Sequence, residues 1–188
     1  MCHALVDDPR FFTLLMEIDR DLADATRAAA CACSGSLHSA NYPRKPRGGL
    51  APLREDFKLR LSFCCRVCRK RTTSESVRFL GRRVYLALVV VLSSSRHAGS
   101  NSAAPRLAGL AVPLRTLERW RLWWQEVFVA TSLWRGGSGS ASFVPPVDIG
   151  ALPASLLERF TQGDAVQRLS ALLRWLGPLT VRSPLSPG

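Results

Sequence analysis

The first hydrophobic pattern in the chain predicts a long helix over residues 9–30. Apolar residues recur there at the spacing of one helical face, at Phe11, Leu14, Leu15, Ile18, Leu22 and Ala25. Pro9 suits the first turn of a helix, and Asp7 and Asp8 place negative charge just before its N-terminus. The polar side carries both signs of charge, so we expect this helix to pack within the chain. The alternative is a homodimer formed through its apolar face.

Residues 31–73 show little helical periodicity and predict loops and short strands. The segment NYPRKPRGGLAP, residues 41–52, is rich in Pro, Gly and Arg, which is typical of an extended basic arm. Residues 57–63 (FKLRLSF) alternate with period two, which predicts a strand. One face would carry Phe57, Leu59, Leu61 and Phe63, and the other, a basic outer face, Lys58, Arg60 and Ser62.

The rest of the chain predicts helices. Residues 76–95 could form a helix or a strand because Val is frequent there; we prefer a helix, with Gly81 as its weak point. A short helix over 104–111, a tight junction at Val112–Pro113 and a long amphipathic helix from Leu114 are typical of a helix-turn-helix. Its apolar stripe consists of Leu114, Leu117, Trp120, Trp124, Val127 and Phe128. A final helical pair follows, the second helix starting at an Asp164 cap and ending at Gly177.

The chain is strongly basic, and the excess charge is concentrated in one region. Its 188 residues include 26 Lys and Arg against 14 acids, a net charge of +12. Residues 31–83 hold thirteen of the bases and three of the acids. Such a balance is typical of proteins that bind polyanions, and we expect nucleic acid as the partner.

The sequence predicts neither a secretory signal nor a membrane span. No basic segment followed by an apolar run opens the chain, and the longest apolar stretch, Val84–Leu92, is too short to cross a bilayer as a helix. We therefore expect a cytoplasmic, nucleoid-associated protein, in a compartment where clustered cysteines indicate metal before disulfide.

Five of the six cysteines form two clusters that predict a zinc site. Cys31 and Cys33 lie in a C-x-C-x-G motif, and Cys65 and Cys68 in a C-x-x-C motif. Four soft ligands from two tight turns suit the tetrahedral geometry of a structural zinc ion. Cys64 could replace Cys65, and His38 could act if the short first motif fails to present both sulfurs. A catalytic zinc usually has three protein ligands and an open position, so four thiolates favour a structural role.

Basic residues occur in two places, around the cysteines and in the first turns of the predicted helix from Leu114. A zinc-fixed platform would present the following side chains to phosphates: Arg44, Lys45, Arg47, Arg66, Arg69, Lys70 and Arg71. In a helix-turn-helix the second helix enters the major groove with its N-terminal residues. Those residues would be Arg115, Thr116 and Arg119, alongside Glu118. An ordinary helical hairpin with Trp residues in its core is the alternative.

Four segments of the chain together resemble the DNA-binding part of bacterial insertion-sequence transposases. In chain order they are C-x-C-x-G-x-L-H, YPRKPRGG, RLSFCCRVCRKRTTSESVRFLGRRVY and RTLERW. The resemblance covers residues 31 to about 125. It implies a zinc ribbon followed by a helical DNA-binding module, with Cys31, Cys33, Cys65 and Cys68 as zinc ligands and duplex DNA such as transposon ends as the partner. These transposases cut DNA with a separate domain that carries three acids. The five acids after residue 83 provide no recognisable counterpart.

The sequence therefore predicts a zinc-dependent duplex DNA-binding accessory or remnant of a transposase, and favours a non-enzymatic role. A transposase or nuclease with an unrecognised acidic site is one alternative. An RNA-binding zinc-ribbon protein that stacks Tyr42 or Phe63 on bases is the other. The expected fold class is α+β, mostly α: a small zinc ribbon with short β-strands, then a helix-turn-helix-like module. The expected division is a packing helix (1–30), zinc ribbon (31–75), helical module (76–134), flexible linker (135–152), C-terminal helical pair (153–180) and disordered tail (181–188).

Overall fold

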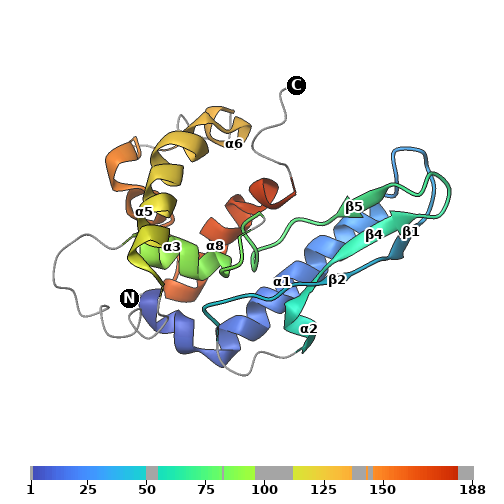
Figure 1. Ribbon diagram of the computed structural model, residues 1–188, viewed down its shortest axis with the longest axis horizontal. Helices are drawn as coiled ribbons and strands as arrows, with labels where there is room; N and C mark the ends of the chain where they lie inside the picture. The colour runs from blue at the N-terminus through green and yellow to red at the C-terminus, as the bar shows by residue number, and fades with distance from the viewer. Residues whose placement is uncertain are drawn as a thin grey trace.

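The computed structural model is α+β and mostly helical, which confirms the predicted fold class at that level. It describes residues 2–49, 55–81, 83–95, 112–136, 143 and 146–181. An arm built on small antiparallel sheets extends from a body of packed helices, and helix α1 (Pro9–Ala28) runs from the body out along the arm (Figure 1). Within the described residues, no helix is both long and apolar enough to cross a membrane.

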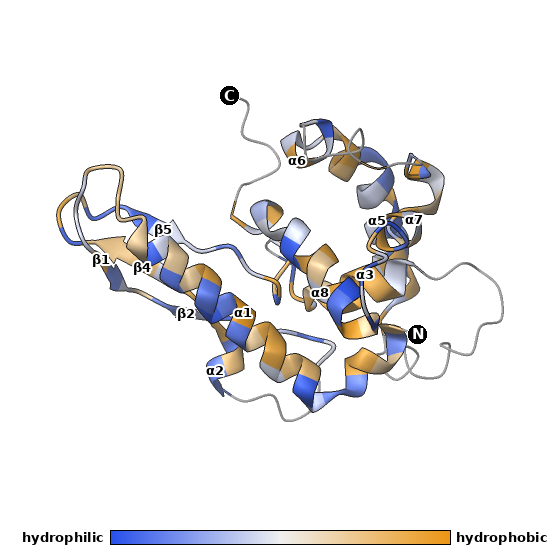
Figure 2. Ribbon diagram, turned by 180° about the vertical axis from the view of Figure 1, so that it is seen from behind, coloured by the Kyte–Doolittle hydropathy of each residue, from blue (hydrophilic) through white to orange (hydrophobic). Residues whose placement is uncertain are grey.

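Helix α1 begins as the sequence predicts and contributes to two hydrophobic cores. Asp8 caps its N-terminus by accepting a hydrogen bond from the Arg10 N–H, and Pro9 occupies the first turn. The first half buries Phe11 and Leu15 in the core of the helical body, whereas Ala23 packs in a second core beneath the sheet. Hydrophobic and hydrophilic residues both occur along its length (Figure 2). Phe11, Leu15 and Ile18 of its apolar face are buried within the chain, as a packing helix requires, and the homodimer stays a prediction.

The arm contains a three-stranded antiparallel sheet in the order β1–β4–β5. Its strands are β1 (Leu37–Ser39), β4 (Ser62–Cys65) and β5 (Arg71–Thr73). Leu37 pairs with Cys65 across β1 and β4. A second, two-stranded sheet joins β2 (Tyr42–Pro43) to β3 (Leu59–Arg60).

The predicted strand over residues 57–63 is wrong in its first part and in its outer face. A helical turn, α2 (Glu55–Lys58), precedes β3, and Leu61 separates β3 from β4. Arg60 is buried rather than exposed, since its guanidinium donates to the Ser74 carbonyl at 2.5 Å and approaches Thr180 Oγ1 at 3.4 Å. Period two was correct for the backbone near β4, but it could not reveal the Ser74 carbonyl and the Thr180 hydroxyl that accept from Arg60.

The predicted helix over residues 76–95 is wrong in its first half. Helix α3 spans Ala87–Ser94 and is entirely buried in the body. The preceding segment is irregular because Asp19 on α1 accepts hydrogen bonds from the Ser76 hydroxyl at 2.5 Å and the Val77 N–H at 2.6 Å. Gly81 has φ +62°, a left-handed backbone conformation that a right-handed helix cannot continue through.

A buried ion pair completes this connection between α1 and the segment before α3. Arg78 Nε lies 2.7 Å from Asp19 Oδ2, and both side chains are fully buried. Arg78 also donates to the carbonyls of Phe57 and Leu59, the latter at 2.8 Å. One arginine thus links α1, α2 and β3, and positions the base of the arm against the body.

The remaining helices and turns belong to the helical body. Helix α5 (Leu114–Leu122) continues as a π-helical turn, η2 (Trp123–Val127), and a 3-10 turn, η3 (Phe128–Ala130). The others are η1 (Cys2–Asp7), α6 (Ser132–Arg135), η5 (Ile149–Ala151), α7 (Ala154–Leu157), α8 (Ala165–Trp175) and η6 (Gly177–Thr180). Helix α8 starts at the predicted Asp164 cap, with a capping box to Gln167.

Several predictions fall wholly or partly outside the described residues. These are the first helix of the helix-turn-helix (104–111), most of the 135–145 part of the linker and nearly all of the tail. In the described part of the linker, Val147 and Leu152 are buried in the main core. That part is packed against the body rather than free of it.

Candidate metal centre

Two short loops at one end of the arm carry the four cysteines of interest. The first follows α1 and turns between Cys31 and Gly35, where the Ser34 N–H bonds the Cys31 carbonyl at 2.7 Å and the Cys31 N–H bonds the Gly35 carbonyl at 3.2 Å. The second joins β4 to β5 and is closed by a Cys65 N–H bond to the Lys70 carbonyl at 3.0 Å. Both loops therefore hold their backbone shape through their own hydrogen bonds.

The four sulfurs meet in the space between these loops. The Sγ atoms of Cys31, Cys33, Cys65 and Cys68 all lie within 4.8 Å of one another. Two pairs of Sγ atoms from opposite loops are each 3.5 Å apart. These pairs are Cys31 with Cys68 and Cys33 with Cys65. Zinc–thiolate bonds of ~2.3 Å in a tetrahedron place sulfurs ~3.8 Å apart. The cluster is therefore of the right size for a tetrahedral metal ion.

Gly35 leaves room for this arrangement. A Cβ at Gly35 would lie 2.6 Å from Cys65 Sγ and 3.0 Å from a methyl group of Val67. A side chain at this position would push the buried Cys65 sulfur away from its neighbours. The glycine of the C-x-C-x-G motif is thus explained by a close approach between the two loops.

The pKa values of the two cysteines of the second loop are shifted in opposite directions. The backbone N–H groups of Cys68 and Val67 point at the Cys65 sulfur and lower the pKa of its thiol to about 6. The pKa of Cys68 is raised to about 11: the Lys70 N–H lowers it, but the neighbouring Cys33 sulfur and burial outweigh that effect. The backbone N–H groups therefore favour the thiolate form of Cys65, which is the form that ligates a metal ion.

The alternative ligands lie outside the cluster. Cys64 points away along β4, with its sulfur 3.5 Å from the Arg69 carbonyl, and His38 pairs with Cys64 across β1 and β4. Neither joins the four-sulfur group. Cys2 is buried in the helical body and directs its sulfur at the Ala165 carbonyl, 3.7 Å away.

The predicted phosphate-binding residues differ in the hydrogen bonds of their side chains. Arg66, Arg69 and Lys70 are exposed on or beside the second cysteine loop. Arg71 is exposed as well, but its guanidinium donates to the Ala40 carbonyl at 2.6 Å and the Ser62 hydroxyl at 2.9 Å. Arg44 is half-buried and donates to the Arg83 carbonyl at 2.9 Å. Arg66, Arg69 and Lys70 therefore present charge that is open to a partner.

The other predicted positions lie at a distance from this loop along the chain. Lys45 and Arg47 are exposed, and the Arg47 backbone bonds to Val84 and Leu86. On α5, Arg115 and Arg119 are exposed and Thr116 is half-buried. No pattern in the sequence points to Arg83, whose pKa is affected by the charge of Arg119, because a single arginine in a loop has no periodicity or motif spacing.

Two features bear on the alternative functions. Phe63 is buried in the second core, so it cannot stack on a base, and Arg71 lies over the Tyr42 ring at 5.6 Å.

Among the residues that the structure describes, the cysteine cluster is the single group of three or more His, Cys, Asp or Glu close enough to share a metal ion.

Comparison of the chain with protein-family models, with curated proteins and with solved structures finds no match.

Proposed function

We propose that this chain is a zinc-stabilised protein that binds duplex DNA through its cysteine arm. The observation that carries the proposal is the convergence of four sulfurs within 4.8 Å, from two loops, beside the exposed basic side chains of Arg66, Arg69 and Lys70. The metal would fix the loop, and the loop would present its charges to phosphates.

Zinc is the metal that these ligands favour. Thiolates are soft ligands, and four of them in a tetrahedron select zinc over magnesium, calcium or manganese. Four protein ligands leave no open position for a substrate, so the ion would be structural. The arm has a small core of Ala23, Leu37, Phe63 and Cys65, and a metal would add the stability that so few residues provide.

Nucleic acid is the partner that the exposed charge favours. Arg66, Arg69 and Lys70 form one basic edge beside the proposed ion, and Arg115 and Arg119 are exposed on α5. The resemblance to the DNA-binding part of insertion-sequence transposases supports duplex DNA as the ligand. Burial of Phe63 removes one of the two stacking residues on which an RNA-binding role would depend.

The decisive experiment compares adjacent cysteines. Cys65→Ser removes a sulfur from the cluster, whereas Cys64→Ser removes the neighbouring sulfur that lies outside it. We expect about one zinc per wild-type chain and per Cys64→Ser chain, and less than ~0.2 per Cys65→Ser chain, by atomic spectroscopy. Equal zinc content in the two variants would refute the metal site.

A second measurement tests the partner. Binding of a duplex DNA should weaken with salt, and replacing Arg66, Arg69 and Lys70 by Gln should reduce the log–log salt slope by about 0.9 for each lost contact. The same titration with duplex RNA separates the two nucleic acids. An unchanged slope in the triple variant would exclude this loop as the binding surface, and equal or tighter binding of RNA would exclude DNA as the preferred ligand.

A further inference from the structure

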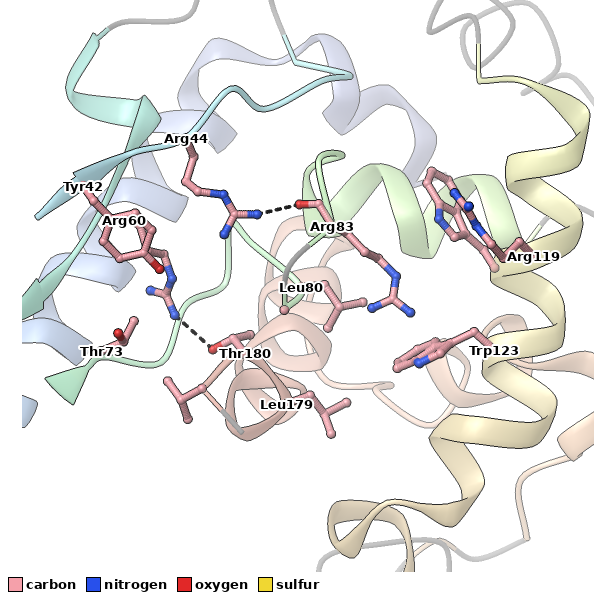
Figure 3. Close-up of a pocket in the computed structure, with 13 residues that line it drawn as sticks. Tyr42, Arg44, Arg60, Thr73, Leu80, Arg83, Arg119, Trp123, Leu179 and Thr180 are labelled. Atoms are coloured by element: carbon pink, nitrogen blue, oxygen red, sulfur yellow. Dashed lines mark hydrogen bonds between the residues drawn. The ribbon is translucent and has the colours of Figure 1, made fainter. Parts of the chain in front are cut away.

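A basic pocket lies between the base of the arm, helix α5 and the C-terminal turn η6. Its volume is about 650 Å³. Arginines enter it from separate elements: Arg44 and Arg60 from the arm, Arg83 from the loop before α3, and Arg119 from α5 (Figure 3). None of the described residues in the lining is acidic; Asp19, whose charge acts on Arg60, lies outside the lining and is paired with Arg78. The lining therefore concentrates positive charge.

Arg83 and Arg119 form the charged wall on the α5 side. The Arg83 guanidinium lies over the Trp123 ring, 3.9 Å from its centroid. Burial, followed by the charge of Arg119, lowers the pKa of Arg83 to about 10, so the side chain stays charged at neutral pH. Neither arginine forms an ion pair with any described carboxylate.

Arg44 and Arg60 form the opposite wall and bond to neutral acceptors. Arg44 donates to the Arg83 carbonyl, and Arg60 to the Ser74 carbonyl and toward Thr180 Oγ1 (Figure 3). Carbonyl and hydroxyl oxygens orient a guanidinium but leave its full charge in place. An anion between the two walls would supply the missing negative charge.

The remaining lining indicates that the anion carries an organic group. The volume is in the range of small-molecule pockets and far exceeds the space of one inorganic phosphate. Leu80, Leu179 and Trp123 offer apolar surface, and Tyr42 and Thr73 offer hydroxyl groups. Trp123 also begins the π-helical turn η2, and such turns occur frequently at functional sites.

We propose that this pocket binds an organic phosphate, with the phosphate held between Arg83 and Arg119 on one wall and Arg44 and Arg60 on the other. Guanidinium groups match phosphate oxygens geometrically and do not lose their charge at neutral pH. The phosphate could belong to a free nucleotide or to a nucleic-acid strand. The inference rests on the pocket alone and does not depend on the cysteine cluster or on the bound metal.

Isothermal titration calorimetry on the full chain tests the proposal with defined probes: pyrophosphate, adenosine 5′-monophosphate, adenosine and a short oligonucleotide without terminal phosphates. We expect saturable binding of at least one phosphate-bearing probe, and binding of adenosine at least tenfold weaker than that of its monophosphate if the ligand is a free nucleotide. Binding of the oligonucleotide alone would assign the phosphate to a strand.

Two arginine variants provide the matched comparison. Arg119→Gln removes a pocket charge, and Arg174→Gln removes the same charge from an exposed position on α8, outside the pocket. We expect Arg119→Gln to weaken the binding probe at least tenfold and Arg174→Gln to change it less than twofold. Equal weakening by both variants, or no saturable binding of any phosphate-bearing probe, would overturn the proposal. Neither result depends on zinc content, so failure here is distinguishable from failure of the DNA-binding function.

Discussion

Asp19 is the acceptor at the centre of the buried network that connects α1 to the segment before α3, and Asp19→Asn tests its role. The carboxylate accepts from Ser76 Oγ at 2.5 Å, Val77 N at 2.6 Å and Arg78 Nε at 2.7 Å. Asn has nearly the same shape but no charge, and its NH₂ group would face a donor. The variant would leave the guanidinium of Arg78 buried without its counter-charge.

The expected loss of stability follows from these contacts. Oδ2 accepts from both Ser76 and Arg78 and Oδ1 accepts from Val77, so an amide oxygen at the Oδ2 position retains two bonds and the Val77 bond is lost. A hydrogen bond to a charged group contributes ~1.5–3 kcal/mol. Because the charge that pairs with Arg78 is lost as well, we expect the ~3–5 kcal/mol observed when one partner of a buried ion pair is removed. For a chain of 188 residues this corresponds to a Tm lower by about 10 °C.

Urea denaturation followed by circular dichroism measures the change, with Asp56→Asn as the control. Asp56 pairs with Arg20 at 3.3 Å, but the arginine and aspartate side chains are 54% and 33% exposed. We therefore expect this control to cost ~0–1 kcal/mol. If Asp19→Asn lowers the free energy of unfolding by no more than Asp56→Asn does, the buried network does not contribute the expected stability.

Two further predictions concern the metal loops and the core. Gly35→Ala places a Cβ 2.6 Å from Cys65 Sγ, so we expect zinc affinity at least tenfold weaker in a competition titration with a chelating dye, and an unchanged affinity would contradict the close approach of the two loops. Leu88→Ala, at a fully buried position of α3, should lower the free energy of unfolding by ~2–5 kcal/mol. Leu122→Ala, at a position 53% exposed, should lower it by less than ~0.5 kcal/mol, and similar losses for both would contradict the burial of α3.

Local signals in the sequence were sufficient for the helices that carry their own caps and periodicity. The Asp8–Pro9 start of α1 and the Asp164 cap of α8 need only a few neighbouring residues, and the structure confirms both. The four-cysteine group was also predictable, because its two short motifs constrain each loop separately. The structure brings Cys31, Cys33, Cys65 and Cys68 together and leaves Cys64 outside.

Long-range contacts explain what the sequence did not reveal. Residues 76–86 have helical composition, but Asp19, 57 residues before Ser76, binds this segment in an irregular conformation. Arg60 looked like a surface residue of an alternating strand, yet its acceptors lie at Ser74 and Thr180. Arg83 and Arg119 come from different elements, and only the packing of α5 on the body brings them to one pocket.

The position of α1 determines which fragments of this chain could fold on their own. Ala23 contributes to the core beneath the cysteine sheet, while Phe11 and Leu15 of the same helix belong to the core of the body. A fragment of residues 31–75 would contain all four clustered cysteines but would lack the helix that covers one side of its sheet. An autonomous metal-binding fragment should therefore begin near Pro9, and a cut between Ala28 and Cys31 should expose hydrophobic surface on both pieces.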